Sequence, residues 1–262
     1  MKSRINGIDI DYRDEGSGPA VVLIHAFPLN QTMWDDQLDK LRAHCRVVTI
    51  DMRGFGGSDA PPGPYLMNQM AADVRALLSS LNIDRAVLVG LSMGGYVSLA
   101  FYRDYPDAVT AMVLADTRAT SDTGEARERR LKSAERAERD GSSAIADDMI
   151  PLLLGRTTIE SRPAVIDRVR AMIESNQPRA IAAAQRGMAE RRDSTDILGK
   201  IDLPVMILVG SEDTLTPMAE AEVLRAGIRG ASLREIEGAG HLSNIERPED
   251  FNAALIEFIT AL

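Results

Sequence analysis

A serine lies between glycines in the segment GLSMG (residues 90–94), directly after the apolar run 86–89. This G-x-S-x-G pattern, at the end of an expected strand and the start of an expected helix, predicts a sharp corner that exposes the Ser92 hydroxyl. The flanking glycines remove Cβ atoms that would clash at such a corner. Because open α/β sheets bind ligands at the carboxyl ends of their strands, we predict that Ser92 is a nucleophile facing a binding site.

A serine hydroxyl is a weak nucleophile until a base accepts its proton, and three histidines could do this. His241 lies in the Gly-rich segment IEGAGHLSNIERP, just after the last expected strand, ASLREIE (residues 231–237). His25 ends an early strand, and His44 lies at the end of an expected helix. We predict that His241 is the base, that His25 is a structural hydrogen-bonding residue near the site, and that His44 lies on the surface.

A histidine base needs a carboxylate that holds its tautomer and stabilises the imidazolium. Two candidates closely follow strands, Asp213 in LVGSEDTLTP and Asp116 in LADTRA. The chain order serine, acid, histidine is typical of this serine corner, and either aspartate preserves it. We favour Asp213, because its short loop leads into a new helix at Pro217, and we interpret Asp116 as a hinge or pocket residue.

Attack on a carbonyl produces an oxyanion, which two preorganised backbone N–H groups would stabilise. One is expected from Met93, the residue after the serine. The other is expected from the loop HAFPLN (residues 25–30), where Pro28 cannot donate and Phe27 is the preferred candidate.

Short apolar runs organise the chain. Continuous runs are typical of strands buried on both faces of a parallel sheet, and they occur at 20–25, 46–51, 85–90, 109–116 and 203–210. Helix-length segments separate most of them, which predicts an α/β fold with helices on both faces of the sheet. Asn6-Gly7, between alternating segments, predicts an antiparallel N-terminal hairpin at one edge.

One interval is too long for a single crossover helix. Between Asp116 and Pro204 the pattern predicts helices over 125–141, 144–155, 164–176 and 180–191, with Pro163 and Pro178 near helix starts. We therefore expect a core of residues 1–117 and 198–262, and a helical insertion over residues 118–197.

Composition limits the classes of function. The chain has 262 residues, 45% of them apolar and 26% charged, which one large α/β domain would accommodate. A formal charge of −9 argues against nucleic acid and anionic membranes as partners. The sequence has no apolar stretch of membrane-spanning length and a single cysteine, so we expect a cytoplasmic protein. Three scattered histidines predict no metal site, and the Gly-rich segment RGFGGSD lacks the last glycine of a dinucleotide-binding motif.

The segments HAFPLNQTMW, DMRGFGGSD, GLSMGG, GSEDTLTP and GAGHLSNIERPEDF together resemble the α/β-hydrolase family along nearly the whole chain. This resemblance implies the α/β-hydrolase fold, no cofactor, and a helical cap formed by the insertion. Within the family the chain is similar to small esterases, perhydrolase-like enzymes and 3-oxoadipate enol-lactonases. This similarity implies a serine hydrolase that forms an acyl-enzyme from a small ester or lactone. A receptor that binds ligand without turnover on the same fold is the alternative.

The ends of the insertion carry arginines that could bind a substrate carboxylate. Arg118 lies at its start, and Arg191 and Arg192 lie near its end, where the cap should meet the sheet. We hypothesise that at least one of the three favours substrates with a distal carboxylate. Further substrate contacts are expected from His25, Asp116, Met188, Leu215 and Leu242.

Overall fold

The computed structural model describes residues 1–262 and contains one eight-stranded sheet, with strand order β1-β2-β4-β3-β5-β6-β7-β8. The six strands β4-β3-β5-β6-β7-β8 are parallel to one another. Strand β2 is antiparallel to both of its neighbours, β1 and β4. The predicted fold class is therefore confirmed. The strands are β1 (Lys2–Ile5), β2 (Ile8–Glu15), β3 (Ala20–Ile24), β4 (Arg46–Ile50), β5 (Ala86–Leu91), β6 (Val109–Ala115), β7 (Val205–Gly210) and β8 (Ser232–Ile236).

The N-terminal hairpin turns at the predicted pair. Asn6 and Gly7 both have positive φ, +48° and +83°, which suits a two-residue turn between twisted strands. On β2 the side chains of Ile8, Ile10 and Tyr12 are buried, whereas the intervening residues are partly exposed. This alternation fits a strand with one face on the core.

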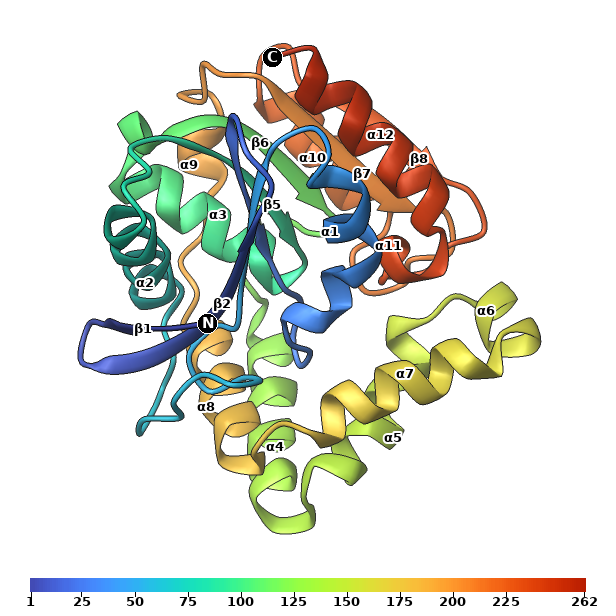
Figure 1. The fold of residues 1–262 in the computed structure, drawn as a ribbon. Helices are drawn as coiled ribbons and strands as arrows, with labels where there is room; N and C mark the ends of the chain where they lie inside the picture. Colours follow the sequence, from blue (N-terminus) through green and yellow to red (C-terminus); the bar gives the residue numbers. More distant parts are fainter.

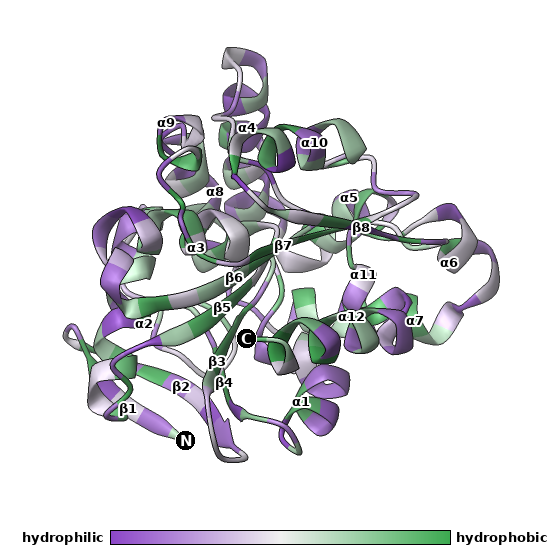
Figure 2. Ribbon diagram, turned by 90° about the horizontal axis from the view of Figure 1, so that it is seen from above, coloured by the Kyte–Doolittle hydropathy of each residue, from purple (hydrophilic) through white to green (hydrophobic).

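Helices cover both faces of the sheet, which explains why the central strands are continuous apolar runs (Figure 2). Helices α2 (Met67–Ser80), α3 (Met93–Asp104) and α10 (Met218–Gly227) cover one face, and α1 (Asp35–Leu41) and α12 (Pro248–Thr260) cover the other. Three short helical elements complete the core, namely η1 (Gln31–Trp34), η2 (Pro106–Ala108) and α11 (Ser243–Glu246). None of the helices combines the length and apolar composition needed to cross a bilayer.

A helical insertion separates β6 from β7, and most of its helices form a group beyond the sheet (Figure 1). Pro163 and Pro178 each occupy the first turn of a helix, where the absence of an N–H costs nothing. The helices are α4 (Gly124–Asp140), α5 (Ser142–Leu153), α6 (Arg156–Ser161), α7 (Pro163–Glu174), α8 (Pro178–Ala189) and α9 (Thr195–Leu198). The four predicted helices correspond to α4, α5, α7 and α8, whereas α6 and α9 were not expected. The division into a core of residues 1–117 and 198–262 and an insertion of residues 118–197 stays a prediction.

Helix α8 contacts the core at a glycine. The backbone N–H of Tyr65, in the loop after β4, donates to the carbonyl of Ala183 on α8 at 3.0 Å. A Cβ added to Gly187, one turn further along α8, would lie 1.7 Å from the Tyr65 carbonyl oxygen. The close approach of α8 to the core therefore depends on the absence of a side chain at residue 187.

We predict that Gly187→Ala destabilises the protein by about 1–3 kcal/mol, because the new methyl group must displace a backbone segment. Urea unfolding would measure the change. Gly124→Ala is the matched control, because a Cβ at this helix-terminal glycine meets nothing within 4 Å. Equal effects of the two substitutions would contradict this account of the contact.

Candidate active site

Ser92 lies on a strained corner between β5 and α3. Its φ is +54°, a conformation that residues other than glycine rarely adopt. A Cβ on Gly94 would lie 2.1 Å from the carbonyl oxygen of Ile24, and one on Gly90 would lie 2.3 Å from that of Gly94. Both flanking glycines are therefore required by space, Gly94 against the end of β3 and Gly90 within the corner itself.

Ser92, His241 and Asp213 form a continuous hydrogen-bonded chain. The Ser92 Oγ lies 2.7 Å from Nε2 of His241, and Nδ1 of His241 lies 2.9 Å from Oδ2 of Asp213. The backbone N–H groups of Leu215 and Thr216 donate to the other Asp213 oxygen, at 2.8 Å and 3.0 Å. The Thr216 hydroxyl donates to Oδ2 at 2.6 Å. The Asp213 loop thus holds its carboxylate in place for one imidazole.

The electrostatics of the buried pair favour an ionised aspartate. Burial raises the pKa of Asp213, but the His241 charge and the bonds from His241 and Thr216 outweigh this and hold it at about 2. Burial lowers the pKa of His241, yet the charge and hydrogen bond of Asp213 raise it above its ordinary 6.5. An imidazole in this setting is suited to accept a proton from the Ser92 hydroxyl.

Asp116, the other candidate acid, has different partners. Its carboxylate accepts from the Gly210 N–H at 2.8 Å and from the Ser243 hydroxyl, and it makes no hydrogen bond with His241. Burial raises the pKa of Asp116 well above its ordinary range, and the nearby Asp213 adds to the rise. Asp116 therefore joins the end of β7 to the loop that carries His241.

The backbone N–H groups of Met93, which follows Ser92, and of Phe27 make no hydrogen bond within the protein. Met93 begins α3, and Phe27 lies in the loop after β3. His25 stabilises this loop through contacts of both of its ring nitrogens. Its Nε2 accepts from the Met52 N–H at 3.0 Å, and its Nδ1 lies 2.9 Å from the Ala26 carbonyl. Burial lowers the pKa of His25, which agrees with a neutral ring that donates through Nδ1.

A cavity of 540 Å³, hereafter the main cavity, opens onto Ser92 and His241. Among the expected substrate contacts, Arg118, Met188 and Leu215 line it, whereas His25, Asp116 and Leu242 do not. Much of the remaining wall comes from α4, α5 and α8, including Arg129, Arg130, Ser133, Asp148, Met149, Leu152, Leu153 and Gln185. The insertion therefore covers the edge of the sheet where Ser92 lies. The acidic, histidine and cysteine side chains nowhere gather into a group that could hold a metal ion.

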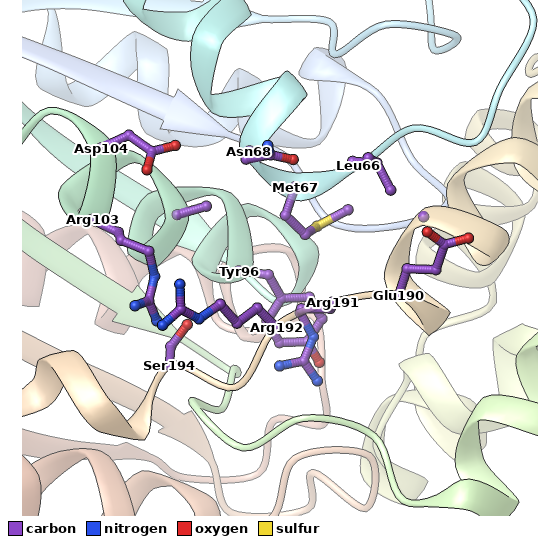
Figure 3. A pocket seen from close by; sticks show the side chains of 12 residues that line it. Leu66, Met67, Asn68, Tyr96, Arg103, Asp104, Glu190, Arg191, Arg192 and Ser194 are labelled. Carbon is purple, nitrogen blue, oxygen red and sulfur yellow. The ribbon is translucent and has the colours of Figure 1, made fainter.

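Arg191 and Arg192 line a second cavity, of 310 Å³, instead of the main one (Figure 3). Tyr96 borders both cavities, and the Arg191 guanidinium lies 3.9 Å from the centre of its ring. Arg192 and Arg103 extend toward each other near Ser194 in Figure 3, and both bind Asp196. Of the three arginines that the sequence suggested, the structure brings only Arg118 to the cavity of Ser92.

Several residues of the site were not expected from the sequence. The hydroxyl of Thr216 bonds Asp213, whereas the sequence indicated only that Thr216 belongs to the same loop. Glu246 is fully buried and accepts from the Gly240 N–H at 2.9 Å and the Gly155 N–H at 2.8 Å, which ties the His241 loop to the insertion. Arg130 reaches the main cavity from the middle of a strongly charged helix, whose composition gives no sign of this position.

Comparisons with known proteins agree with this fold. A model of the alpha/beta hydrolase family matches residues 21–254, so the chain belongs to that family. A thermophilic esterase from Thermogutta terrifontis, solved with malate bound, is 41% identical with a TM-score of 0.96, covering 100% of this chain and 98% of that one. The enol-lactonase from Burkholderia xenovorans is 30% identical with a TM-score of 0.93, covering 99% and 100%. The 3-oxoadipate enol-lactonase 2 of Acinetobacter baylyi is 29% identical over 90% of this chain and 87% of its own length.

The two aspartates should affect His241 unequally. We predict that Asp213→Asn lowers the pKa of His241 below 6.5, because burial remains while the bonded anion is lost. Asp116→Asn should lower it less, because Asp116 is not bonded to the ring. Titration of the His241 ring nitrogens by NMR measures both effects. A larger decrease in Asp116→Asn would identify Asp116 as the partner of the imidazole.

Proposed function

We propose that the protein is a serine hydrolase of carboxylic esters or lactones, with Ser92 as nucleophile, His241 as base and Asp213 as the orienting acid. The observation that carries the proposal is the chain of two short hydrogen bonds from Ser92 through His241 to Asp213 beside a cavity. Hydrolase relatives, which include esterases and enol-lactonases, support the same class of reaction.

In the first half of the proposed reaction, Ser92 Oγ attacks the carbonyl carbon while Nε2 of His241 accepts the hydroxyl proton. The carbonyl oxygen becomes an oxyanion, and the unpaired N–H groups of Phe27 and Met93 are its proposed donors. Asp213 stabilises the imidazolium. When the tetrahedral intermediate collapses, the imidazolium gives its proton to the leaving alkoxide, so an alcohol and an acyl-enzyme result.

In the second half, His241 accepts a proton from water, and the hydroxide attacks the acyl carbon. The same two N–H groups stabilise the oxyanion of the second tetrahedral intermediate, which then collapses and breaks the bond to Ser92 Oγ. The proton returns to Ser92 Oγ, and the carboxylic acid leaves. With a lactone, the alcohol remains covalently part of the acyl chain, so there is a single product. A saturated lactone gives a hydroxy acid, and an enol-lactone gives an enol acid that tautomerises to a keto acid.

Similarity to two enol-lactonases favours 3-oxoadipate enol-lactone hydrolysis as a more specific candidate. The malate in the Thermogutta esterase supports the view that a relative accepts a small dicarboxylate. A panel of simple esters, saturated lactones and enol-lactones, assayed side by side, would decide between an esterase and a lactonase.

We predict that Ser92→Ala leaves a folded protein whose ester turnover falls by roughly 10⁴–10⁶-fold, because the nucleophile is absent. A chromogenic butyrate ester measures turnover, circular dichroism checks folding, and exposed Ser79→Ala is the control. An organophosphate should modify the parent at Ser92 alone. Labelling at another residue would contradict the mechanism, and a parent limited to one slow turnover would identify a ligand-binding receptor instead.

The proposed base predicts the direction of the pH dependence. Protonated His241 cannot accept the Ser92 proton, and its pKa lies above 6.5, so kcat/KM should rise with pH through a transition above that value. Because the pKa of Asp213 is about 2, that carboxylate adds no transition above about pH 4. Initial rates with a neutral ester between about pH 5 and 9 test both points. A rate that falls with pH over this range would exclude His241 as a general base.

A further inference from the structure

The wall of the main cavity carries more positive than negative charge. Arg118, Arg129 and Arg130 line it, against a single lining carboxylate, Asp148. Asp148 is paired with Arg136. A neutral ester would use none of these charges, so their placement beside the nucleophile calls for an explanation in terms of the substrate.

Three guanidinium groups share the carboxylate of Asp122. Arg118 approaches one oxygen at 2.9 Å and Arg191 approaches the same oxygen at 3.3 Å, whereas Arg130 binds the other oxygen. Burial raises the pKa of Asp122, but the three cations outweigh it and lower the pKa below its ordinary value. Glu220 is the next acid, 3.9 Å from Nη1 of Arg118. Asp122 is therefore the only carboxylate within 3.5 Å of Arg118 or Arg130, and three guanidinium groups share it.

All three arginines have side-chain donors that make no hydrogen bond within the protein. Nε of Arg118 is buried without a partner, and its Nη1 makes no hydrogen bond. Arg130 binds Gln185 through Nη1 at 3.1 Å, and its Nη2 has no partner. The Nε of Arg191 is also buried without a partner, but Arg191 donates to the Thr120 carbonyl and lies against Tyr96, outside the main cavity.

The same cavity also has an apolar part. Met149, Leu153 and Leu215 line it together with Ser92. A ligand with its carbonyl at Ser92, an apolar spacer and an anionic end would bury the spacer against these side chains. Guanidinium groups bind carboxylates through paired N–H donors, a geometry that an ammonium group cannot offer.

Building on the proposed hydrolase function, we propose that Arg118 and Arg130 form a carboxylate-binding subsite in the main cavity. The preferred substrates are then esters or lactones that carry a second, free carboxylate. Asp122 holds the two guanidinium groups in place, and the substrate carboxylate accepts from their unused N–H donors.

The test compares two esters with the same six-carbon acyl chain, monoethyl adipate and ethyl hexanoate, by acid release at constant pH. The parent should show kcat/KM at least about tenfold higher for the hemiester, as charged hydrogen bonds allow. Arg118→Met and Arg130→Met should each lower this preference by about fivefold or more. Arg186→Met is the control, because Arg186 pairs with Glu138 on the outer surface and should leave the preference unchanged.

A measurement on the parent protein keeps the proposal testable if either methionine variant fails to fold. Adipate should inhibit ethyl hexanoate hydrolysis competitively at concentrations about tenfold lower than hexanoate does, and added salt should weaken this advantage. Carboxymethyl hexanoate carries its carboxylate on the leaving group, so it shows whether the subsite binds the acyl side or the leaving-group side of the ester. A preference for either charged ester supports the proposal.

The failures of the two proposals are distinguishable. If the parent hydrolyses neither charged nor neutral esters, the proposed hydrolase function is wrong. If it hydrolyses ethyl hexanoate at least as well as both charged esters, and adipate inhibits no better than hexanoate, only the subsite is wrong. An unchanged preference in folded Arg118→Met and Arg130→Met would also overturn the assignment to these two arginines.

Discussion

The positive φ of Ser92 is the constraint on which the site depends, because an L-residue adopts it only when its surroundings leave no alternative. The Ser92 N–H donates to the Ala115 carbonyl at 2.9 Å, and the Ser92 carbonyl accepts from the Thr117 hydroxyl at 2.8 Å. Both partners lie at the end of β6, the neighbouring strand. The packing of the parallel strands thus holds the corner, and Gly90 and Gly94 allow the chain to approach that closely.

This corner also determines where charge must be buried. His241, which bonds Ser92, is 2% exposed, so an acid that bonds the far side of its ring must be buried as well. A buried carboxylate is costly unless hydrogen bonds replace its hydration. Asp213 meets this condition with donors from two backbone N–H groups, a hydroxyl and the imidazole. Asp116, with no cationic partner of its own, is the carboxyl more easily held in its neutral form.

The sequence predicted the parts of this arrangement that follow from local patterns. Apolar runs located most of the parallel strands. Ser92 was recognisable because it directly follows β5, and Asp213 and His241 because they lie in the loops after β7 and β8. The strands end at one edge of the sheet, so their loops meet without further information. The four long insertion helices were equally visible, because helical spacing is a local property.

Contacts between the insertion and the core could not be predicted in this way. Arg118 and Arg191 both lie near the ends of the insertion, yet Tyr96 separates the cavities that they line. Arg130 belongs to a helix whose surface charges look alike in sequence, and only the packing of that helix against α8 selects Arg129 and Arg130 as the arginines that line the cavity. Such choices depend on the crossing of helices distant in the chain, which no spacing rule encodes.

Glu246 connects the loop that carries His241 to the insertion. The insertion contributes to the loop of the base directly, because the Leu242 N–H donates to the Leu153 carbonyl and the Gly155 N–H donates to Glu246. The same carboxylate accepts from Gly240, one residue before His241. A shift of this part of the insertion would therefore move partners of the base itself. The helices that shape the main cavity are thus also part of the scaffold that positions His241 against Ser92.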